Sequence, residues 1–410
     1  MNQVIFDKTD SLSPIKVWGD IEPKTLEQIK NVAALPFIFR CIALAPDNHP
    51  GDGIPIGSII PCSGYVIPNA VGSDIGCGMS AIPLGIPASD FSDKETVTSL
   101  FEKLMEVIPV GIERHGVHDL DGHARSDRYS NSMFIANKLI ESKSYDALCS
   151  TMRGPVFETI LTQMGTLGDG NHFFELQKDA NDMLWFMVHS GSRNLGAMVC
   201  KLHLKIAQDM CERYHSKLED KSLAYLHASS PEGKNYIEQM NIALKYAYLN
   251  REEMIRQALQ VLEESFGYVV DMKNIINIHH NYATIENHYG KNVWVHRKGA
   301  TCARKGMFGI IPGSMCTKSY IVRGLGCEDS LTSCSHGSGR NFSRTEARKR
   351  IEDGTDAPIL EQLGDVLVFG STDYEDEGKS AYKDVENVMA NQEDLVEIVE
   401  ELIPIAVLKG

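Results

Sequence analysis

Two short segments carry residue types suited to metal and nucleophile chemistry. Asp74-Ile-Gly-Cys77-Gly places a carboxylate and a thiol three residues apart between glycines, in a chain without any Cys-x-x-Cys pair. A carboxylate beside a soft thiolate suits a divalent transition-metal ion. Ser335-His336-Gly-Ser-Gly-Arg340 leaves one imidazole among small residues, with a guanidinium four positions later. Because such a ring is open to a bulky reactant, the two segments predict metal-assisted chemistry at a nucleophilic histidine.

Three histidines occur where a strand-like run ends or is interrupted, each beside Gly, Asn or Ser: His172, His189 and His280. With Asp74 and Cys77 they give five candidate ligands. Imidazole, thiolate and carboxylate together favour Mn, Fe, Co or Zn over Mg or Ca. Five ligands exceed the needs of one tetrahedral ion, so two ions bridged by the thiolate fit the set. The pattern alone leaves an ordinary core or surface role open for each histidine.

Two glycine-rich segments could cradle phosphates with their backbone N–H groups. They are Gly165-Thr-Leu-Gly-Asp-Gly170-Asn-His172 and Pro312-Gly-Ser-Met-Cys-Thr-Lys-Ser319. Neither has P-loop spacing, so Lys318 is not interpreted as a Walker lysine. Beside a basic segment and a metal cluster they predict a nucleoside-triphosphate site. His336 would then attack an α-phosphate while a metal neutralises charge, and Arg340 would offer a planar fork to phosphate oxygens.

The composition is that of an ordinary globular protein, with 410 residues of which 43% are hydrophobic and 23% charged. The first ten residues lack the apolar core of a signal peptide, and no apolar run is long enough to cross a bilayer. We therefore expect a cytoplasmic protein without a membrane partner. The ten cysteines show neither disulfide-scaffold nor zinc-ribbon spacing and are expected to be reduced.

The charge along the chain is uneven. A net charge of −15 argues against a protein that coats nucleic acid non-specifically. Residues 296–350, however, contain eleven Lys/Arg and three Asp/Glu, a local balance of +8 that leaves −23 for the remainder. Such asymmetry is typical of a polyanion site in an otherwise repelling surface. For residues 344–350 a solvated basic helix face is an equally open interpretation.

The elements that must position these residues can be placed coarsely. Strand-like runs occur at 37–44, 185–188, 293–296, 320–322 and 366–369. Helical patterns cover 195–217 and 234–266, the second as one long helix or two. Ser343 and Glu346 have capping-box spacing, which predicts a helix just after the His336 segment. The polar stretch 115–130 is expected to form a mobile loop. Candidate functional residues extend from 74 to 409, which predicts one domain, residues 1–410, folded around one site.

Eight motifs resemble, in content, order and spacing, those of the RtcB family of RNA ligases. They lie at Pro46–His49, Val71–Met79, Gly165–Phe173, His189–Arg193, His279–Tyr282, Arg297–Ala300, Pro312–Met315 and Ser335–Arg340. The closing Lys409-Gly410 is also similar to that family's C-terminus, and the length resembles its compact bacterial form. The resemblance implies an α+β fold, a single large domain with mixed β-sheets around a binuclear metal site.

The activity that the resemblance implies is RNA ligation with GTP as co-substrate and two Mn²⁺ ions. RNA with 2′,3′-cyclic phosphate or 3′-phosphate ends would be joined to 5′-hydroxyl ends, in RNA repair or tRNA splicing. His336 would take GMP from GTP, and GMP would move onto the RNA 3′-phosphate before the 5′-hydroxyl attacks. The resemblance leaves an activating protein partner, the physiological RNA and the oligomeric state open.

The resemblance also implies roles for individual residues. Cys77 would bridge two Mn²⁺ ions, with Asp74 and His172 completing one site and His189 and His280 the other. Arg193 and Arg340 would lie near the RNA phosphate path. Glu175 would recognise the edge of the guanine base. The full set implied for GTP or GMP is Asn171, Phe173, Glu175, Asn281, Ser314, Ser319, His336, Gly339, Tyr382 and Lys409.

Four positions depart from the usual family pattern. Asp52 stands where many members have Lys or an aromatic residue, and Asp169 stands where Ser, Thr or Gly is usual. Cys316 replaces a glycine, and Ser338 replaces a common alanine. The candidate ligands are untouched, so these changes bear on nucleotide affinity and RNA preference.

Two other functions compete with ligation. A binuclear metallophosphoesterase that opens 2′,3′-cyclic phosphates would keep the five candidate ligands but would have no need of His336 or a guanine pocket. A non-catalytic RNA-binding paralogue would be expected to lose ligands first. The intact His336 segment, Glu175 and Lys409 favour the ligase over the phosphoesterase.

Overall fold

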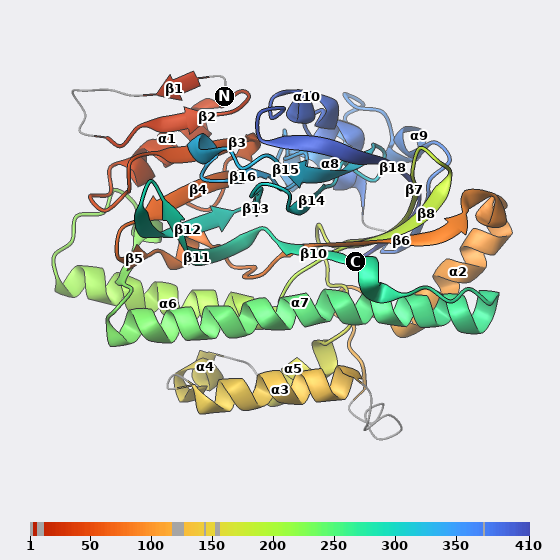
Figure 1. The fold of residues 1–410 in the computed structure, drawn as a ribbon, viewed down its shortest axis with the longest axis horizontal. Helices are drawn as coiled ribbons and strands as arrows, with labels where there is room; N and C mark the ends of the chain where they lie inside the picture. Colours follow the sequence, from red (N-terminus) through yellow and green to blue (C-terminus); the bar gives the residue numbers. More distant parts are fainter. Residues whose placement is uncertain (1–2, 6–11, 117–126, 143–144, 152–155, 372–373) are drawn as a thin grey trace.

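The computed structural model describes residues 3–5, 12–116, 127–142, 145–151, 156–371 and 374–410. Two mixed β-sheets lie on one side of the long helices α6 and α7 (Figure 1). Helices α3, α4 and α5 lie on the opposite side of α7 from the sheets (Figure 1). The molecule is a single-domain α+β structure with several sheets, as expected.

The first sheet has six strands in the order β1-β2-β3-β4-β12-β11. All its pairs are antiparallel except β2 with β3. Its strands are β1 (Gln3–Ile5), β2 (Ile15–Val17), β3 (Ile42–His49), β4 (Ile56–Cys62), β11 (Asn281–His288) and β12 (Lys291–Lys298). Helix α1 (Pro23–Ala33) packs against this sheet through buried apolar residues such as Ile29 and Val32.

The second sheet has the order β10-β6-β8-β7-β18-β15-β14, with β17 added beside β18. Its strands are β6 (Gly78–Pro87), β7 (Phe173–Lys178), β8 (Met183–Ser190), β10 (Ile276–His279), β14 (Phe308–Ile311), β15 (Ser319–Gly324), β17 (Leu367–Gly370) and β18 (Val396–Lys409). Strand β8 is apolar almost throughout because both its faces are covered. Phe186 and Val188 pack towards α7, and Met187 packs towards β14 and β15.

Two short ribbons complete the strands of the described residues: β5 (Tyr65–Val66) with β9 (Leu226–His227), and β13 (Ala300–Cys302) with β16 (Ser333–Ser335). The chain passes from the second sheet to the first at a single residue. His280 lies between the end of β10 and the start of β11. The β13–β16 ribbon lies close by and leads directly into His336. The two sheets therefore meet where several candidate residues are located.

Helix α7 (Pro231–Phe266) is one continuous helix of 36 residues. Ser230 caps its first turn by accepting the Gly233 N–H, and Gly267 ends it in the left-handed region. Because α2, α3, α6 and the second sheet surround it, its buried residues cover several faces. The other helices are α2 (Lys94–Val107), α3 (Asp127–Glu141), α4 (Tyr145–Thr151), α5 (Val156–Gln163), α6 (Asn194–Arg213), α8 (Arg344–Glu352), α9 (Ile359–Leu363) and α10 (Val385–Ala390).

Most of the predicted elements are confirmed, with differences at their ends. The helix predicted at 195–217 is α6 and ends at Arg213, and the pattern at 234–266 is α7. Ser343 caps α8 by accepting the Glu346 N–H, as its spacing predicted. The run at 37–44 is a strand only from Ile42 onwards. Of the predicted loop at 115–130, residues 117–126 lie outside the described part, and the loop prediction is wrong from Asp127, where α3 begins. None of the described helices is both long enough and apolar enough to span a membrane.

Candidate metal centre and nucleotide cleft

The five candidate ligands lie together because of the register of four neighbouring strands. Gly78 at the start of β6 pairs with Ser190 at the end of β8 and with His279 at the end of β10. Phe173, the first residue of β7, pairs with His189 on β8. In antiparallel neighbours the start of one strand adjoins the end of the next, so the residues flanking these pairs converge on one edge. Cys77, His172, His189 and His280 lie in or next to these pairs, and Asp74 stands three residues before Cys77.

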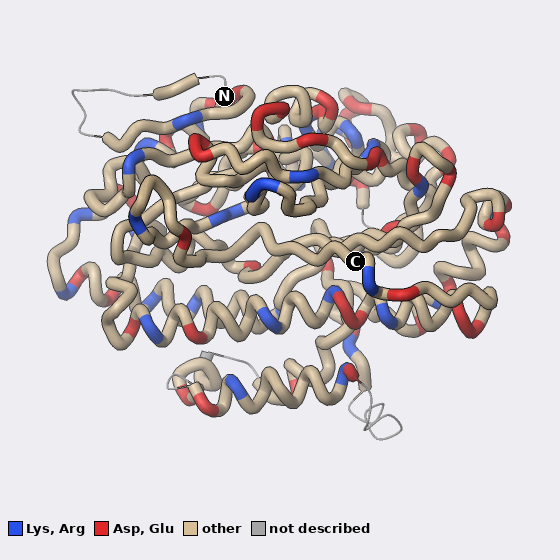
Figure 2. The backbone as a smooth tube through the Cα atoms, viewed as in Figure 1, with Lys and Arg blue, Asp and Glu red and all other residues tan. Residues whose placement is uncertain are grey.

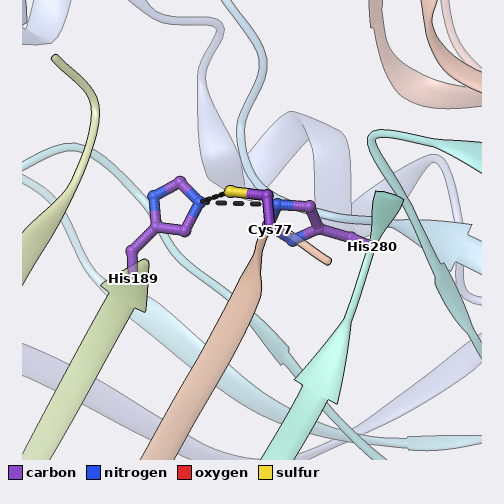
Figure 3. A group of neighbouring side chains, drawn as sticks. All are labelled: Cys77, His189 and His280. Carbon is purple, nitrogen blue, oxygen red and sulfur yellow. Dashed lines mark hydrogen bonds between the residues drawn. The ribbon is translucent and has the colours of Figure 1, made fainter. Parts of the chain in front are cut away.

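Cys77 is the centre of this group. Its Sγ lies 3.2 Å from His189 Nε2 and 3.6 Å from His172 Nε2. His189 Nε2 lies 3.4 Å from His280 Nε2, and Figure 3 shows these three side chains pointing at one another from adjacent strand ends. His172 Nε2 lies 3.1 Å from Asp74 Oδ2. The donor atoms form two triads that share Cys77, one with Asp74 and His172 and the other with His189 and His280.

Hydrogen bonding fixes which atoms of the cluster carry protons. His189 Nδ1 lies 3.0 Å from the carbonyl oxygen of Asn171, which can only accept, so Nδ1 carries the proton. Burial lowers the pKa of His189 well below its usual value. The ring is therefore neutral, and its bare Nε2 faces Cys77 and His280. Atoms of the cluster point lone pairs at one another, with too few protons between them to form hydrogen bonds. Such an arrangement fits a bound cation.

Electrostatics of the cluster agree with this. Burial raises the pKa of the Cys77 thiol, and the neighbouring Asp74 raises it further. Burial also opposes ionisation of Asp74, but hydrogen bonds from His172 and Cys77 outweigh it and lower the carboxyl pKa. A transition-metal ion held by such a thiol favours the thiolate. The donor set of one shared sulfur, three imidazoles and a carboxylate fits a pair of transition ions better than Mg²⁺ or Ca²⁺.

His336 lies beside this cluster and is held by Asp47. The His336 and His280 rings are 4.8 Å apart, centroid to centroid. His336 Nδ1 donates to Asp47 Oδ2 over 2.6 Å, and the same oxygen accepts the backbone N–H groups of His336 and Gly337. Asp47 is fully buried in β3, and the His336 side chain is 18% exposed. Because Nδ1 carries the proton, the unprotonated Nε2 is the atom available to a reactant.

A cleft opens beside His336 with an empty volume of about 690 Å³, its open mouth included. Strands β7 and β18 form one wall, where the register pairs Phe173 with Lys409 and Glu175 with Val407. Alternate residues on a strand share a face, so these four side chains line the same wall. The predicted nucleotide residues that line the cleft are Asn171, Phe173, Glu175, Ser314, His336, Gly339, Tyr382 and Lys409, with Arg340 beside them.

Glu175 is a buried carboxyl group in the cleft wall. One of its oxygens accepts a short hydrogen bond from the Gln177 amide. Burial raises the Glu175 pKa to about 8, and the opposing effects of Gln177 and Lys409 are smaller. A carboxyl group in this state gains strongly from a ligand that offers it N–H donors.

A second carboxylate in the cleft, Glu377, was not anticipated from the sequence. It accepts from Tyr382 Oη at 2.6 Å and from Arg344 at 2.6 Å. Lys409 Nζ lies 3.2 Å from it and donates to the Gly170 carbonyl at 2.8 Å. Burial raises the Glu377 pKa, but Lys409, Arg344 and Tyr382 outweigh that and lower it to about 2. Glu377 thereby holds the buried ammonium of Lys409 in the cleft.

Three predicted residues lie outside the cleft lining. Ser319 is buried behind it, where its hydroxyl accepts from Gln177 and from the Gly313 N–H. Asn281 donates to the Asp74 carbonyl at 3.1 Å and accepts the Gly299 N–H at 2.7 Å. Arg193 bonds Thr166 and the Gly111 carbonyl. Their predicted roles at GTP and RNA stay predictions.

The four departures from the family pattern occupy different environments. The side chains of Asp52 and Asp169 are exposed, whereas Ser338 is buried and lines the cleft. Cys316 is half-buried next to the cleft residue Met315, and burial raises its thiol pKa to about 11. A protonated thiol at that position adds no charge to the cleft.

The basic segment 296–350 is far less positive in the fold than in the sequence. Eight of its cations form ion pairs with carboxylates from other parts of the chain. These are Arg297 and Arg304 with Glu286, Lys318 with Glu401, Arg323 with Glu397, Arg340 and Arg344 with Glu377, Arg348 with Asp376, and Arg350 with Asp356. Both charge signs are likewise interspersed along α6 and α7 (Figure 2). The local balance of +8 therefore overstates the field offered to a polyanion.

Comparison with known proteins decides the family. A family model described as "tRNA-splicing ligase RtcB" matches residues 28–410. The chain belongs to the RtcB family. Two Escherichia coli proteins, RNA-splicing ligase RtcB1 and, in strain K12, RNA-splicing ligase RtcB, are each 38% identical over 98% of both chains. The tRNA-splicing ligase RtcB of Methanococcus maripaludis is 29% identical over 96% of this chain and 93% of its own.

The family resemblance drawn from the motifs is thus confirmed, and the RtcB family supports an enzyme that joins RNA ends. Sequence reasoning missed His49 and Glu377, which line the cleft, and Asp47, which binds His336 from behind it. Asp47 and His49 lie in a motif that carried the resemblance, but nothing in that motif assigned them a partner. Asp47 binds His336 across 289 residues of sequence, a separation that no local pattern reveals.

Proposed function

We propose that this chain is a GTP- and Mn²⁺-dependent RNA ligase of RNA repair or tRNA splicing. Its substrates are RNA 3′-phosphate or 2′,3′-cyclic phosphate ends and RNA 5′-hydroxyl ends. The observation that carries the proposal is the Asp47–His336 pair, which presents a bare imidazole nitrogen beside a donor cluster that shares the Cys77 sulfur, in the cleft lined by the candidate nucleotide residues.

The first step uses His336 as the nucleophile. Its Nε2 lone pair attacks the α-phosphorus of GTP, an N–P bond forms, and the bond to the departing pyrophosphate breaks. The imidazole acquires positive charge in this step, because Nδ1 keeps its proton. Asp47 accepts a buried hydrogen bond from that N–H group and so stabilises the charge. A phosphoramidate of GMP on His336 is the product.

The metal cluster supports this chemistry from one side. Asp74, Cys77 and His172 would hold one Mn²⁺, and Cys77, His189 and His280 would hold the other. When bound, the ions mask phosphate charge and so lower the barrier to attack by a neutral nucleophile. The 4.8 Å separation of the His280 and His336 rings supports a nucleophile that lies next to the ions.

The cleft wall supplies nucleotide recognition. Glu175 accepts N–H donors from the Watson–Crick edge of guanine, donors that adenine does not present in the same places. Phe173 on the same wall provides an apolar ring face, and Lys409 provides a cation held by Glu377. Asn171, Ser314, Gly339 and Tyr382 complete the contacts to the nucleotide. Ser319 supports the wall by accepting from Gln177, the residue that binds Glu175.

The later steps transfer GMP to RNA. An oxygen of the RNA 3′-phosphate attacks the phosphoramidate, the N–P bond breaks, and a 3′-to-5′ pyrophosphate link to guanosine forms. The RNA 5′-hydroxyl then attacks the RNA phosphate, and GMP leaves. A cyclic phosphate enters this route after water opens it to a 3′-phosphate. Arg193 and Arg340 are the proposed contacts to RNA phosphates, and Asn281 is the proposed contact to the GTP γ-phosphate.

The test is a labelling experiment with the purified full-length protein. Mn²⁺ and either α-³²P-GTP or α-³²P-ATP are added, and the products are separated on a denaturing gel. We expect an acid-labile adduct that forms with GTP only and is absent from His336→Ala. An adduct that persists in His336→Ala would remove the nucleophile assignment. Absence of any adduct in Mn²⁺-loaded protein would favour the cyclic phosphoesterase or the non-catalytic paralogue.

A further inference from the structure

The middle of helix α7 carries two polar residues where an apolar stripe would be expected. Ala243, Ala247, Met254 and Ala258 are buried along one side of the helix at helical spacing. Arg251 falls within that stripe, and Asn250 precedes it; both side chains are completely buried. A buried guanidinium is costly unless each donor is satisfied, so the partners of these two residues indicate why they are there.

Arg251 binds three of the segments that carry candidate ligands. Its Nη1 donates to the Gly76 carbonyl and to the Ser190 carbonyl, each at 2.9 Å. Its Nη2 lies 3.1 Å from His279 Nδ1, a nitrogen that also lies 3.0 Å from the Gly76 carbonyl oxygen. Gly76, Ser190 and His279 are the immediate neighbours of Cys77, His189 and His280. Its Nε donates to Asn277 Oδ1 on β10 at 2.9 Å.

Asn250 binds the remaining segment, which ends at His172, and the residue that packs on Asp74. Its Oδ1 accepts the Gly165 N–H at 2.7 Å, and its Nδ2 donates to the Thr166 carbonyl at 3.1 Å. These two residues begin the glycine-rich segment that ends at His172. Nδ2 also lies 3.2 Å from the Gly191 carbonyl. Gly191 packs so closely on Asp74 that a Cβ there would lie 2.2 Å from the carboxylate, so its position limits that of Asp74.

We propose that Asn250 and Arg251 are the positioning residues of the metal centre. They hold the four segments that carry the five ligands to one helix, although neither contacts a ligand donor atom in the contacts described. This inference rests on the metal assignment in the proposed function. Hydrogen bonds to residues next to Cys77, His189 and His280, and to the start of the segment that ends at His172, limit where the ligand side chains start. Outer contacts of this kind tune metal affinity by about 10- to 100-fold.

Helix α7 also provides the matched comparison. Gln239 lies three turns earlier on the same helix, is completely buried, and hydrogen-bonds His203 and Ser142. None of these partners adjoins a candidate ligand. Loss of Gln239 therefore removes buried hydrogen bonds from α7 without touching the ligand segments. A role that is only structural would make Arg251 and Gln239 variants behave alike.

The test measures metal affinity and apo-protein stability separately in the full-length chain. Mn²⁺ is titrated while free Mn²⁺ is followed by its EPR signal, and the unfolding temperature is recorded without metal. We expect Arg251→Lys, which keeps the charge but not the fork, to weaken Mn²⁺ binding by about 10- to 100-fold. We expect Gln239→Leu to lower the apo unfolding temperature and to leave Mn²⁺ affinity at the parent value.

An Arg251→Lys variant that binds Mn²⁺ within twofold of the parent would overturn the inference and leave the proposed function standing. If the parent binds no Mn²⁺, the metal assignment fails and the inference fails with it. Should Arg251→Lys not fold, Asn277→Ala decides, because it removes only the acceptor of Nε and the Asn277 bond to Tyr248. Weaker Mn²⁺ binding by that variant supports the inference, and unchanged binding overturns it.

Discussion

Asp47 Oδ2 accepts three hydrogen bonds from the His336 loop, the shortest being 2.6 Å from His336 Nδ1. One carboxylate oxygen therefore sets both the backbone of the loop and the tautomer of the ring. The other oxygen, Oδ1, is buried without a hydrogen-bond partner among the described residues. These three hydrogen bonds all involve Oδ2. They require at that position an atom that only accepts hydrogen bonds, as a carboxylate oxygen does.

Asp47→Asn tests this dependence. The amide can place an N–H against His336 Nδ1, which moves the ring proton to Nε2 and removes the nucleophilic lone pair. We expect GMP attachment to slow by about 10²- to 10⁴-fold, as for other carboxylates that orient a catalytic imidazole. Mn²⁺ content should stay at the parent value, because Asp47 is not in the donor cluster. Asp93→Asn, at the exposed cap of α2, is the control for the substitution itself.

Two glycines in the loop that carries His336 lead to a prediction about stability. Gly339 has φ +73°, and a Cβ there would lie 2.1 Å from the Asp47 carbonyl oxygen. At Gly337, two residues earlier, a Cβ would lie 3.5 Å from its nearest neighbour, and φ is not in the left-handed region. We expect Gly339→Ala to lower the unfolding free energy by about 1–3 kcal/mol, and Gly337→Ala to change it by less than about 1 kcal/mol. Urea unfolding of both variants measures the difference, and equal losses would contradict the role of the close approach.

The sequence predicted the candidate ligands better than the residues that hold them. Asp74 and Cys77 are neighbours in the chain, and the three histidines stand at strand ends with small residues, so local patterns single them out. Asp47 and Glu377 gain their roles only from residues far away in the sequence. Local reasoning has no access to such pairs. The positive charge of segment 296–350 was overestimated for the same reason, because the carboxylates that pair with its cations lie outside the segment.

The sequence contained a signal that Arg251 is buried, but the faces of the helix had to be assigned to find it. In the stretch Asn250-Arg-Glu-Glu253 it resembles a solvated helix surface. The apolar spacing of Ala247, Met254 and Ala258 nevertheless places it on the buried side of α7. A charged residue in a core stripe indicates a buried polar network. The prediction of a helix was correct. An assignment of its buried and exposed faces would also have predicted that Arg251 is buried.

The shared position of Cys77 predicts unequal effects of ligand loss. Cys77 Sγ belongs to both donor triads, whereas His172 belongs to one. We expect Cys77→Ala to lose both Mn²⁺ ions and His172→Ala to lose about one, as measured by elemental analysis of dialysed protein. His203→Ala is the control, because His203 is equally buried but bonds Gln239 instead. Retention of two ions by Cys77→Ala would contradict the bridging role.

The raised pKa of Glu175 predicts how the proposed recognition of guanine depends on pH. Its pKa is about 8 in the free cleft because of burial, and N–H donors of guanine require the carboxylate. Below pH 8 the ligand must displace a proton, so affinity for guanosine should rise with pH by up to about tenfold per unit from pH 6 and level off above 8. Calorimetry without metal in two buffers measures the released proton. Glu175→Gln should bind guanosine more weakly and without this pH dependence.

The raised pKa of Glu175 also predicts how the free energy of unfolding depends on pH. Because the folded pKa lies above the usual 4.5, the contribution of Glu175 to the unfolding free energy is fully present below pH 4.5. It is lost as the pH rises towards 8, where the fold must bury a charged carboxylate. Glu175→Gln cannot ionise, so its stability relative to the parent should improve between pH 5 and 8. A parent and variant whose unfolding free energies keep a constant difference over that range would show that Glu175 ionises freely in the cleft.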